Sequence, residues 1–165
     1  MLYSTIGHYS LVLGLCVSLL IVFFSIKNFK NSQILSSKVL SFTFLQFFLV
    51  VVSFLSLIIS FVLSDFSNET VFNNSHTTKP FFYKIAGTWG NHEGSLLLWL
   101  LVLTLFIFIF ILRTKNQPIK YKLLTLIFQQ IIIIGFFLFL IQTSNPFNYI
   151  YPVPDEGLGL NPILQ

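Results

Sequence analysis

Four long runs of apolar residues divide the sequence, at 6–26, 39–63, 95–112 and 123–142. None of them contains Asp, Glu, Lys or Arg. A helix needs about 20 apolar residues to cross the hydrocarbon core of a bilayer, and a spanning segment must satisfy its own backbone hydrogen bonds, as a helix does. The runs therefore predict an all-α integral membrane protein with four transmembrane helices.

Charged residues make up only 8% of the 165 residues, against about 25% in soluble domains. Four spans leave little chain for a separate globular module, so we expect a single transmembrane domain over 1–165. The first run has no positive charge before Lys27 and no small-residue cleavage site, which favours a retained span over a signal peptide. The single cysteine, Cys16, excludes disulfide frameworks and cysteine-based metal sites.

The charges between the runs are distributed unequally. The two short connections hold seven basic residues and no acid: Lys27, Lys30, Lys38, Arg113, Lys115, Lys120 and Lys122. The segments 64–94 and 143–165 hold two basic residues and all five acids. Because basic loops face the cytoplasm or matrix, we expect both termini, the loop 64–94 and the tail 143–165 on the outer side. These loops account for the net charge of +4, so nucleic acid is not implied as a partner.

Composition also indicates the kind of genome. The sequence has 21 Phe, one Ala and one Arg beside eight Lys, although Ala is normally among the commonest residues. Phe, Ile, Asn and Lys have AT-rich codons, whereas Ala and Arg mostly do not. For a multispan hydrophobic protein this bias favours a mitochondrial gene and the mitochondrial inner membrane. The alternative is the inner membrane of an AT-rich bacterium.

Uncharged polar residues interrupt the second and fourth runs: Thr43, Gln46, Ser53, Ser56, Thr125, Gln129 and Gln130. Such residues line a pathway in some proteins, but more often they hydrogen-bond between packed helices, and we favour packing. No carboxylate or lysine lies inside a span. A proton or ion pump therefore has no visible relay here.

The loop before the third run ends in a glycine-rich motif, Gly87-Thr-Trp-Gly-Asn-His-Glu-Gly-Ser-Leu-Leu-Leu-Trp99. Its three glycines, Gly87, Gly90 and Gly94, permit backbone angles that other residues resist. They are typical of a tight return of the chain into the membrane.

The other residues of the motif also have a structural interpretation. Glu93 and Ser95 fall at the expected helix start, where a carboxylate suits the helix dipole and a hydroxyl can cap free amides. Trp89 and Trp99 suit the aromatic belt at the membrane interface. On this interpretation the motif is a capped and anchored start of the third span.

A functional interpretation concerns His92, since an imidazole beside a carboxylate can bind a metal or heme iron or shuttle a proton. Position 96 is Leu, so His92-Glu93 does not begin a zinc-protease motif. His76 lies in a polar stretch and is expected to be solvated, and His8 is expected to be an interface residue. The candidate residues for organising a heme site or docking a partner are Trp89, Gly90, Asn91, His92, Glu93, Gly94, Ser95 and Trp99.

Two other features stand outside the spans. Asn68-Glu-Thr70 and Asn73-Asn-Ser75 match the N-glycosylation pattern, which is common by chance. The tail from Asn145 onward contains four prolines and is expected to be extended.

The motif Thr88-Trp-Gly-Asn-His-Glu-Gly-Ser-Leu-Leu-Leu-Trp99 resembles the signature of the CcmF family, the System I heme lyases of cytochrome c maturation. Three further blocks match the family in order: Ile6-Gly-His-Tyr-Ser-Leu, Thr143-Ser-Asn-Pro-Phe147 and Gly159-Leu-Asn-Pro-Ile-Leu-Gln165. The resemblance covers the whole chain. It implies the N-terminal portion of such a protein, from a split mitochondrial gene or from a truncated sequence.

The family is implied to take heme from CcmE and attach it to apocytochrome c on the outer face. Its Trp-rich heme loop and its heme-ligating histidines lie beyond Gln165, so heme is the cofactor of the assembled complex, no ligand is expected in this chain, and no catalytic residue is evident. The implied partners are the remaining CcmF portion with the Trp-rich loop, CcmE, CcmH-like proteins, apocytochrome c and membrane lipid. The alternative function is a non-catalytic scaffold subunit of a respiratory membrane complex, and a stand-alone transporter is a weaker third.

Overall fold

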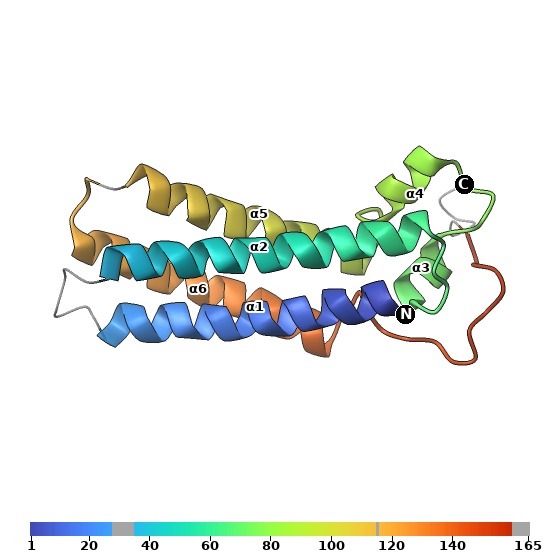
Figure 1. Cartoon of the computed structure of the whole chain (residues 1–165), viewed down its shortest axis with the longest axis horizontal. Coiled ribbons are helices and arrows are strands. Elements are labelled where there is room, and N and C mark those ends of the chain that lie inside the picture. Colours follow the sequence, from blue (N-terminus) through green and yellow to red (C-terminus); the bar gives the residue numbers. More distant parts are fainter. Residues whose placement is uncertain (28–34, 115, 160–165) are drawn as a thin grey trace.

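The computed structural model describes residues 1–27, 35–114 and 116–159. Within them the chain is helical, with α-helices as its regular elements (Figure 1). In chain order these are α1 (Leu2–Lys27), α2 (Leu35–Val62), α3 (Glu69–Asn74), α4 (Phe81–Gly87), α5 (His92–Arg113) and α6 (Ile119–Gln142). Four of them, α1, α2, α5 and α6, are long and apolar enough to cross a membrane, which confirms the predicted all-α membrane fold.

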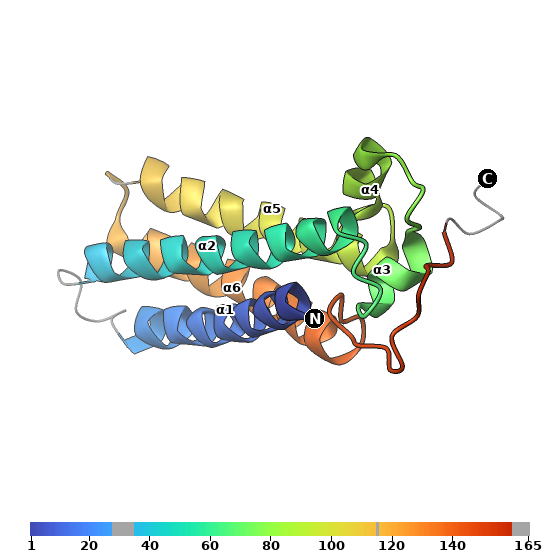
Figure 2. The same ribbon diagram turned by 45° about the vertical axis from the view of Figure 1, so that its right-hand side comes forward.

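The four long helices form a bundle in which each packs against two neighbours. Helix α1 contacts α2 and α6, and α5 contacts α2 and α6. Figures 1 and 2 show them running side by side, with α3, α4 and the start of α1 gathered at one end. We call this the polar end, made up of residues 1–8, 63–93 and 143–159.

The spans are longer than their apolar runs. Each helix begins three or four residues earlier than predicted, for example at His92 instead of 95 and at Ile119 instead of 123. A helix continues into polar residues at the membrane boundary because its backbone hydrogen bonds do not depend on the hydrophobicity of its side chains. Two short helices, α3 and α4, lie within the predicted loop 64–94, where sequence indicated no element.

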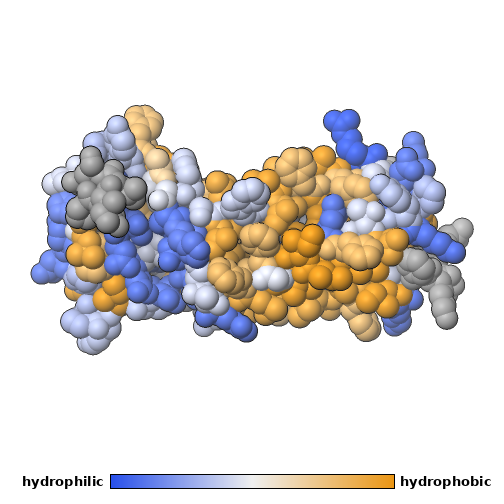
Figure 3. Space-filling view, turned by 180° about the vertical axis from the view of Figure 1, so that it is seen from behind, coloured by the Kyte–Doolittle hydropathy of each residue, from blue (hydrophilic) through white to orange (hydrophobic). Residues whose placement is uncertain are grey.

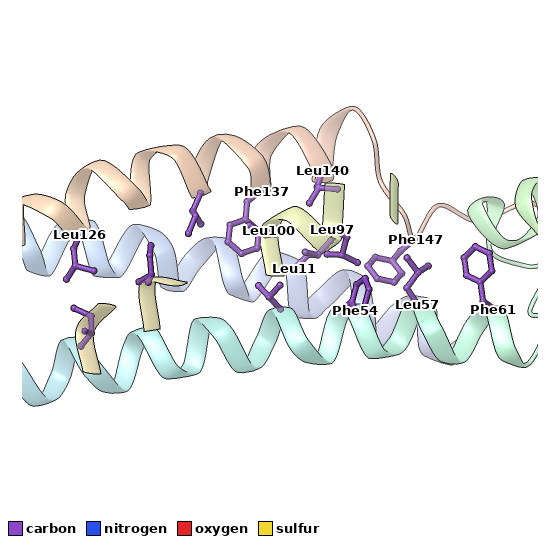
Figure 4. Close-up of a cluster of buried hydrophobic side chains, with 14 of the residues drawn as sticks. Leu11, Phe54, Leu57, Phe61, Leu97, Leu100, Leu126, Phe137, Leu140 and Phe147 are labelled. Carbon is purple, nitrogen blue, oxygen red and sulfur yellow. The ribbon is translucent and has the colours of Figure 1, made fainter. Parts of the chain in front are cut away.

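The buried core follows the axis of the bundle. Figure 4 shows Leu126, Phe137, Leu100 and Leu11 in succession along it, and then Phe147 and Phe61 near the polar end. The outside of the bundle is apolar as well. Figure 3 shows a hydrophobic belt between two hydrophilic ends, as expected for helices that face lipid.

Of the polar residues within the spans, Gln46, Ser53 and Gln130 hydrogen-bond between helices, as expected, whereas Thr43, Ser56 and Thr125 donate to carbonyls of their own helices. Gln46 of α2 and Gln130 of α6 exchange two amide hydrogen bonds, of 3.0 and 2.8 Å, and both side chains are fully buried. Gln46 Nε2 also donates to Ser18 Oγ of α1 at 2.6 Å, and Ser53 Oγ donates to the carbonyl of Gly7 at 3.1 Å. These bonds join three helices.

Some predictions fall on residues outside the described ranges. They are the position of the basic connection around Lys30, that of Lys115, and the conformation of the last tail residues, 160–165. In the described part of the tail, 143–159, the chain forms no helix.

Candidate functional site

Asn91 organises the start of α5. Its extended backbone (φ −125°, ψ 169°) places it at the N-cap, where its Oδ1 accepts a hydrogen bond of 2.7 Å from the Gly94 N–H. Its Nδ2 donates to the carbonyl of Gly87 at 2.7 Å. Asn91 therefore satisfies a free amide of the helix and also ties the preceding turn to it.

The structure agrees with the expected role of Glu93 but not with that of Ser95. Glu93 lies in the first turn of α5, where its charge suits the helix dipole. Ser95 does not cap the helix, because its Oγ donates to the carbonyl of His92 at 2.9 Å. The helix begins at His92, so Ser95 lies too far along the chain to be the capping residue.

The glycines of the motif serve close approach instead of unusual backbone angles. Among the described glycines a positive φ occurs only at Gly159, outside the motif. A Cβ on Gly94 would lie 1.6 Å from the carbonyl oxygen of Thr88, whereas one on Gly87 would lie 3.2 Å from the Phe61 ring. Gly94 is therefore the position at which the turn requires glycine, and the expected need for special angles at these three residues is wrong.

His92 joins the start of α5 to the end of α6. Its Nδ1 is hydrogen-bonded to Ser144 Oγ at 2.9 Å, and its ring meets the Phe139 ring edge-on, with centroids 6.4 Å apart. Its Nε2 makes no hydrogen bond to any residue that the structure describes. His92 is thus held by Nδ1, and its Nε2 is available to hydrogen-bond with a group of another molecule.

The resemblance blocks at 6–11 and 143–147 pack directly on each other. Phe147 is buried against Gly7, where an added Cβ would lie 2.3 Å from the Phe147 ring. Asn145 Nδ2 is hydrogen-bonded to Nδ1 of His8 at 3.2 Å. His8 is therefore a contact of the tail. Segments separated by most of the chain length meet at the polar end.

Asn68 is a central residue of the polar end that sequence reasoning did not identify. It is fully buried, and its Nδ2 donates to Ser4 Oγ at 3.0 Å and to the Pro146 carbonyl at 2.9 Å. Its Oδ1 accepts from the Val71 N–H and so caps α3. The sequence marked Asn68 only as a glycosylation match, and its burial leaves no room for a glycan in this fold.

Two further contacts hold the tail to the loop. The Glu69 N–H donates to the carbonyl of Asn148 at 2.9 Å. Glu156 accepts hydrogen bonds of 2.9 and 2.7 Å from the backbone N–H and hydroxyl of Thr77, and lies 3.7 Å from His76. These hydrogen bonds hold the pKa of Glu156 below its ordinary value.

A polar cavity of about 560 Å³ opens at the polar end between α3, the start of α5 and the tail. Its walls are amides, hydroxyls, two carboxylates and one imidazole, from Glu69, Thr70, Asn73, Asn74, Gly90, Asn91, His92, Glu93, Thr143, Ser144, Asn145 and Asn148. Among the described residues, neither Glu69 nor Glu93 has a salt-bridge partner.

The predicted site residues therefore separate into two groups. Gly90, Asn91, His92 and Glu93 line the cavity. Trp89 and Trp99 are exposed, at 42% and 61%, and Gly94 and Ser95 shape the helix start without lining the cavity. The remaining lining residues come from α3 and from 143–148. The sequence signal for the tail residues was the resemblance block that begins at Thr143, whereas no functional signal marked those of α3.

The residues around the cavity do not fit a heme. A porphyrin needs apolar walls and an axial ligand on its iron, whereas the walls here are polar and carry the single imidazole of His92. Within the described residues, no three His, Cys, Asp or Glu side chains lie close enough together to hold a metal ion. The geometry suits a polar or cationic segment of another protein chain.

Comparison with known proteins shows that the chain is similar to cytochrome c-type biogenesis proteins. No protein-family model matches it. It is 41% identical over 161 residues to the cytochrome c-type biogenesis protein CycK of Rhizobium meliloti, covering 97% of this chain and 24% of that protein. It is 37% identical over 163 residues to the cytochrome c-type biogenesis protein CcmF of Escherichia coli, covering 97% and 25%.

A solved structure has the same fold. It is titled cytochrome c heme lyase CcmF and matches with a TM-score of 0.78 at 23% identity, over 88% of this chain and 25% of that one. The chain thus spans about a quarter of the length of the relatives that it matches, an extent that fits the N-terminal portion indicated by the motifs. The chain belongs to the CcmF/CycK family of cytochrome c-type biogenesis proteins, as a portion of such a protein.

Proposed function

We propose that the chain is the N-terminal part of a CcmF-like heme lyase and takes part in covalent attachment of heme to apocytochrome c. The observation that carries the proposal is the extended match to CcmF and CycK proteins. Further support comes from the resemblance blocks 88–99 and 143–147, which both line one cavity, and from the block 6–11, which contacts the second of these through His8 and Asn145. The chain works with a partner, the remaining CcmF portion, which supplies the Trp-rich loop and the heme ligands.

The polar end faces the outer side of the membrane, where apocytochrome c, CcmE and CcmH-like proteins act. The charge asymmetry of the connections supports this orientation. The composition supports the mitochondrial inner membrane as its location. A cysteine at the exposed Asn73 in a Cys16→Ser background should react with an impermeant thiol reagent applied from outside, and one at Gln117 should not. The reverse labelling would overturn the orientation.

The cavity organises the site and docks a polar segment of the partner. Its unpaired carboxylates, Glu69 and Glu93, suit a basic side chain of that segment, and the free Nε2 of His92 suits a hydrogen-bonding group. The chain positions the partner's heme-facing residues and does not itself bond the iron.

Depletion of the chain tests the function. Covalent c-type heme, measured by heme staining of denatured membrane proteins, should fall while b-type cytochromes persist. Resupply of the wild-type chain should restore it. If c-type and b-type cytochromes fall together with one respiratory complex, the chain is instead a scaffold subunit of that complex.

A further inference from the structure

Helix α4 exposes an unusual run of aromatic residues. Phe81, Phe82 and Tyr83, in its first turn, are 55%, 80% and 64% exposed. Exposed aromatic runs of this kind are unfavourable in water. They call for a partner that covers them.

The height of α4 along the bundle is fixed by contacts with the end of α2. Lys84 Nζ donates to Ser64 Oγ at 2.6 Å, and Gly87 lies against the Phe61 ring. Figures 1 and 2 agree that α4 lies beside the end of α2. The aromatic run is therefore at the level where this span ends.

The lipid-facing surface reaches the same level. Leu63, directly after α2, is 58% exposed, and the hydrophobic belt borders the polar end (Figure 3). The interfacial layer on each side of a bilayer is about 5–8 Å thick, and a helix of seven residues is about 10 Å long. The first turn of α4 is thus within reach of the headgroup layer.

The lysines beside the run point back to the protein. Lys79 Nζ donates to the carbonyl of Asn74 at 3.0 Å, and burial lowers the pKa of Lys79. With Lys84 bonded to Ser64, both cations are held against the bundle. The aromatic residues are left on the free side of α4.

We propose that α4 is an interfacial anchor whose Phe81, Phe82 and Tyr83 insert into the headgroup region of the phospholipid bilayer. Aromatic side chains favour this layer because it accepts both an apolar ring and a polar tip. The turn Thr88–Asn91 follows α4 directly, so lipid contact sets the height of the cavity above the membrane. This inference does not depend on the proposed function.

The test places a fluorescent reporter on the helix. Phe82→Trp is made in a Trp89→Phe, Trp99→Phe background, and the purified full chain is reconstituted into phosphatidylcholine vesicles brominated near the headgroup or near the end of the acyl chain. Fluorescence of the new tryptophan should be quenched roughly twofold more by the shallow bromines than by the deep ones, as for belt tryptophans. Phe81→Trp repeats the measurement.

Two matched controls calibrate depth. Ile131→Trp, at an exposed position in the middle of α6, should be quenched mainly by deep bromines. Asp155→Trp, at an exposed tail position, should not be quenched. Emission at 82 that is unquenched and shifted to the red, as in water, would overturn the anchor. Unquenched emission shifted to the blue would overturn it too, because a protein surface would then cover the run.

Discussion

Two polar regions join the helices of this chain, and they differ in whether their side chains are hydrogen-bonded to one another or left without partners. In the middle of the bundle, Gln46 and Gln130 satisfy each other across α2 and α6. At the polar end, His92 bonds Ser144 through one nitrogen only, and Glu69 and Glu93 have no salt-bridge partner among the described residues. A closed network serves packing, whereas a network open to a cavity is available to a partner.

The largest effect is expected at Gly94. In Gly94→Ala the new Cβ meets the Thr88 carbonyl, so the turn must open, at a cost of about 2–3 kcal/mol. The protein should fail to accumulate in membranes or should unfold at a clearly lower temperature. Gly135→Ala is the matched control, because nothing lies within 4 Å of its Cβ and alanine favours helix. Equal stability of the two variants would contradict the close approach.

His92→Gln and Glu93→Gln should separate function from folding. Glutamine can still pair with Ser144, and loss of a helix-dipole charge costs at most about 1 kcal/mol. Both variants should therefore accumulate normally, while holocytochrome c, measured by heme stain, falls severalfold. Normal holocytochrome c levels in both variants would contradict a docking role of the cavity. Loss of the protein from the membrane would indicate that the motif serves folding only.

Changes in the network of Gln46 and Gln130 should lower stability and leave function unchanged, the opposite of the result expected for His92 and Glu93. Gln130→Leu leaves the buried Oε1 of Gln46 without its donor, while Nε2 keeps its hydrogen bond to Ser18, and should cost about 1 kcal/mol. Gln46→Leu with Gln130→Leu should cost less than the sum of the two single changes, because no orphaned amide remains. Unfolding of the purified chain in detergent measures the cycle. Holocytochrome c per folded molecule should not change, and a drop would show that the mid-bundle network also serves function.

The smallest effect is a pH dependence of the tail. The pKa of Glu156 is lowered by hydrogen bonds from Thr77, so this contact is fully present above the ordinary glutamate pKa of 4.5 and is lost as pH falls through the lower folded value. Hydrogen exchange of the backbone at 156–159 should therefore accelerate in acid relative to the bundle. Glu156→Gln should show little of this pH dependence. A wild-type tail that is insensitive to acid would exclude the contact.

Sequence reasoning predicted the features that depend on local composition. The four spans follow from apolar runs alone, and the block 87–99 was identified as a helix start. Asn91 could have been predicted as the cap, because asparagine is a preferred N-cap residue. The prediction instead used the apolar run, which begins at 95, and so placed the helix start too far along the chain. A helix boundary set by capping precedes the one set by hydrophobicity.

Contacts between distant segments were not predictable in the same way. Asn68 bonds Ser4 and Pro146, which are 64 and 78 residues away, and nothing local marks it as a buried junction. The pairing of His92 with Ser144 likewise depends on how α5 and α6 end side by side. The family resemblance identified two of the segments that meet, but the hydrogen bonds between them could be identified only from the three-dimensional structure.

Affinity purification of the tagged chain from native membranes tests the central claim most directly. The account predicts that the eluate contains a longer CcmF-type chain with a Trp-rich loop, together with apocytochrome c, and shows a heme Soret band. That band should persist in His92→Ala if the partner supplies the ligands. Recovery of respiratory-chain subunits without any cytochrome c maturation protein would contradict the account.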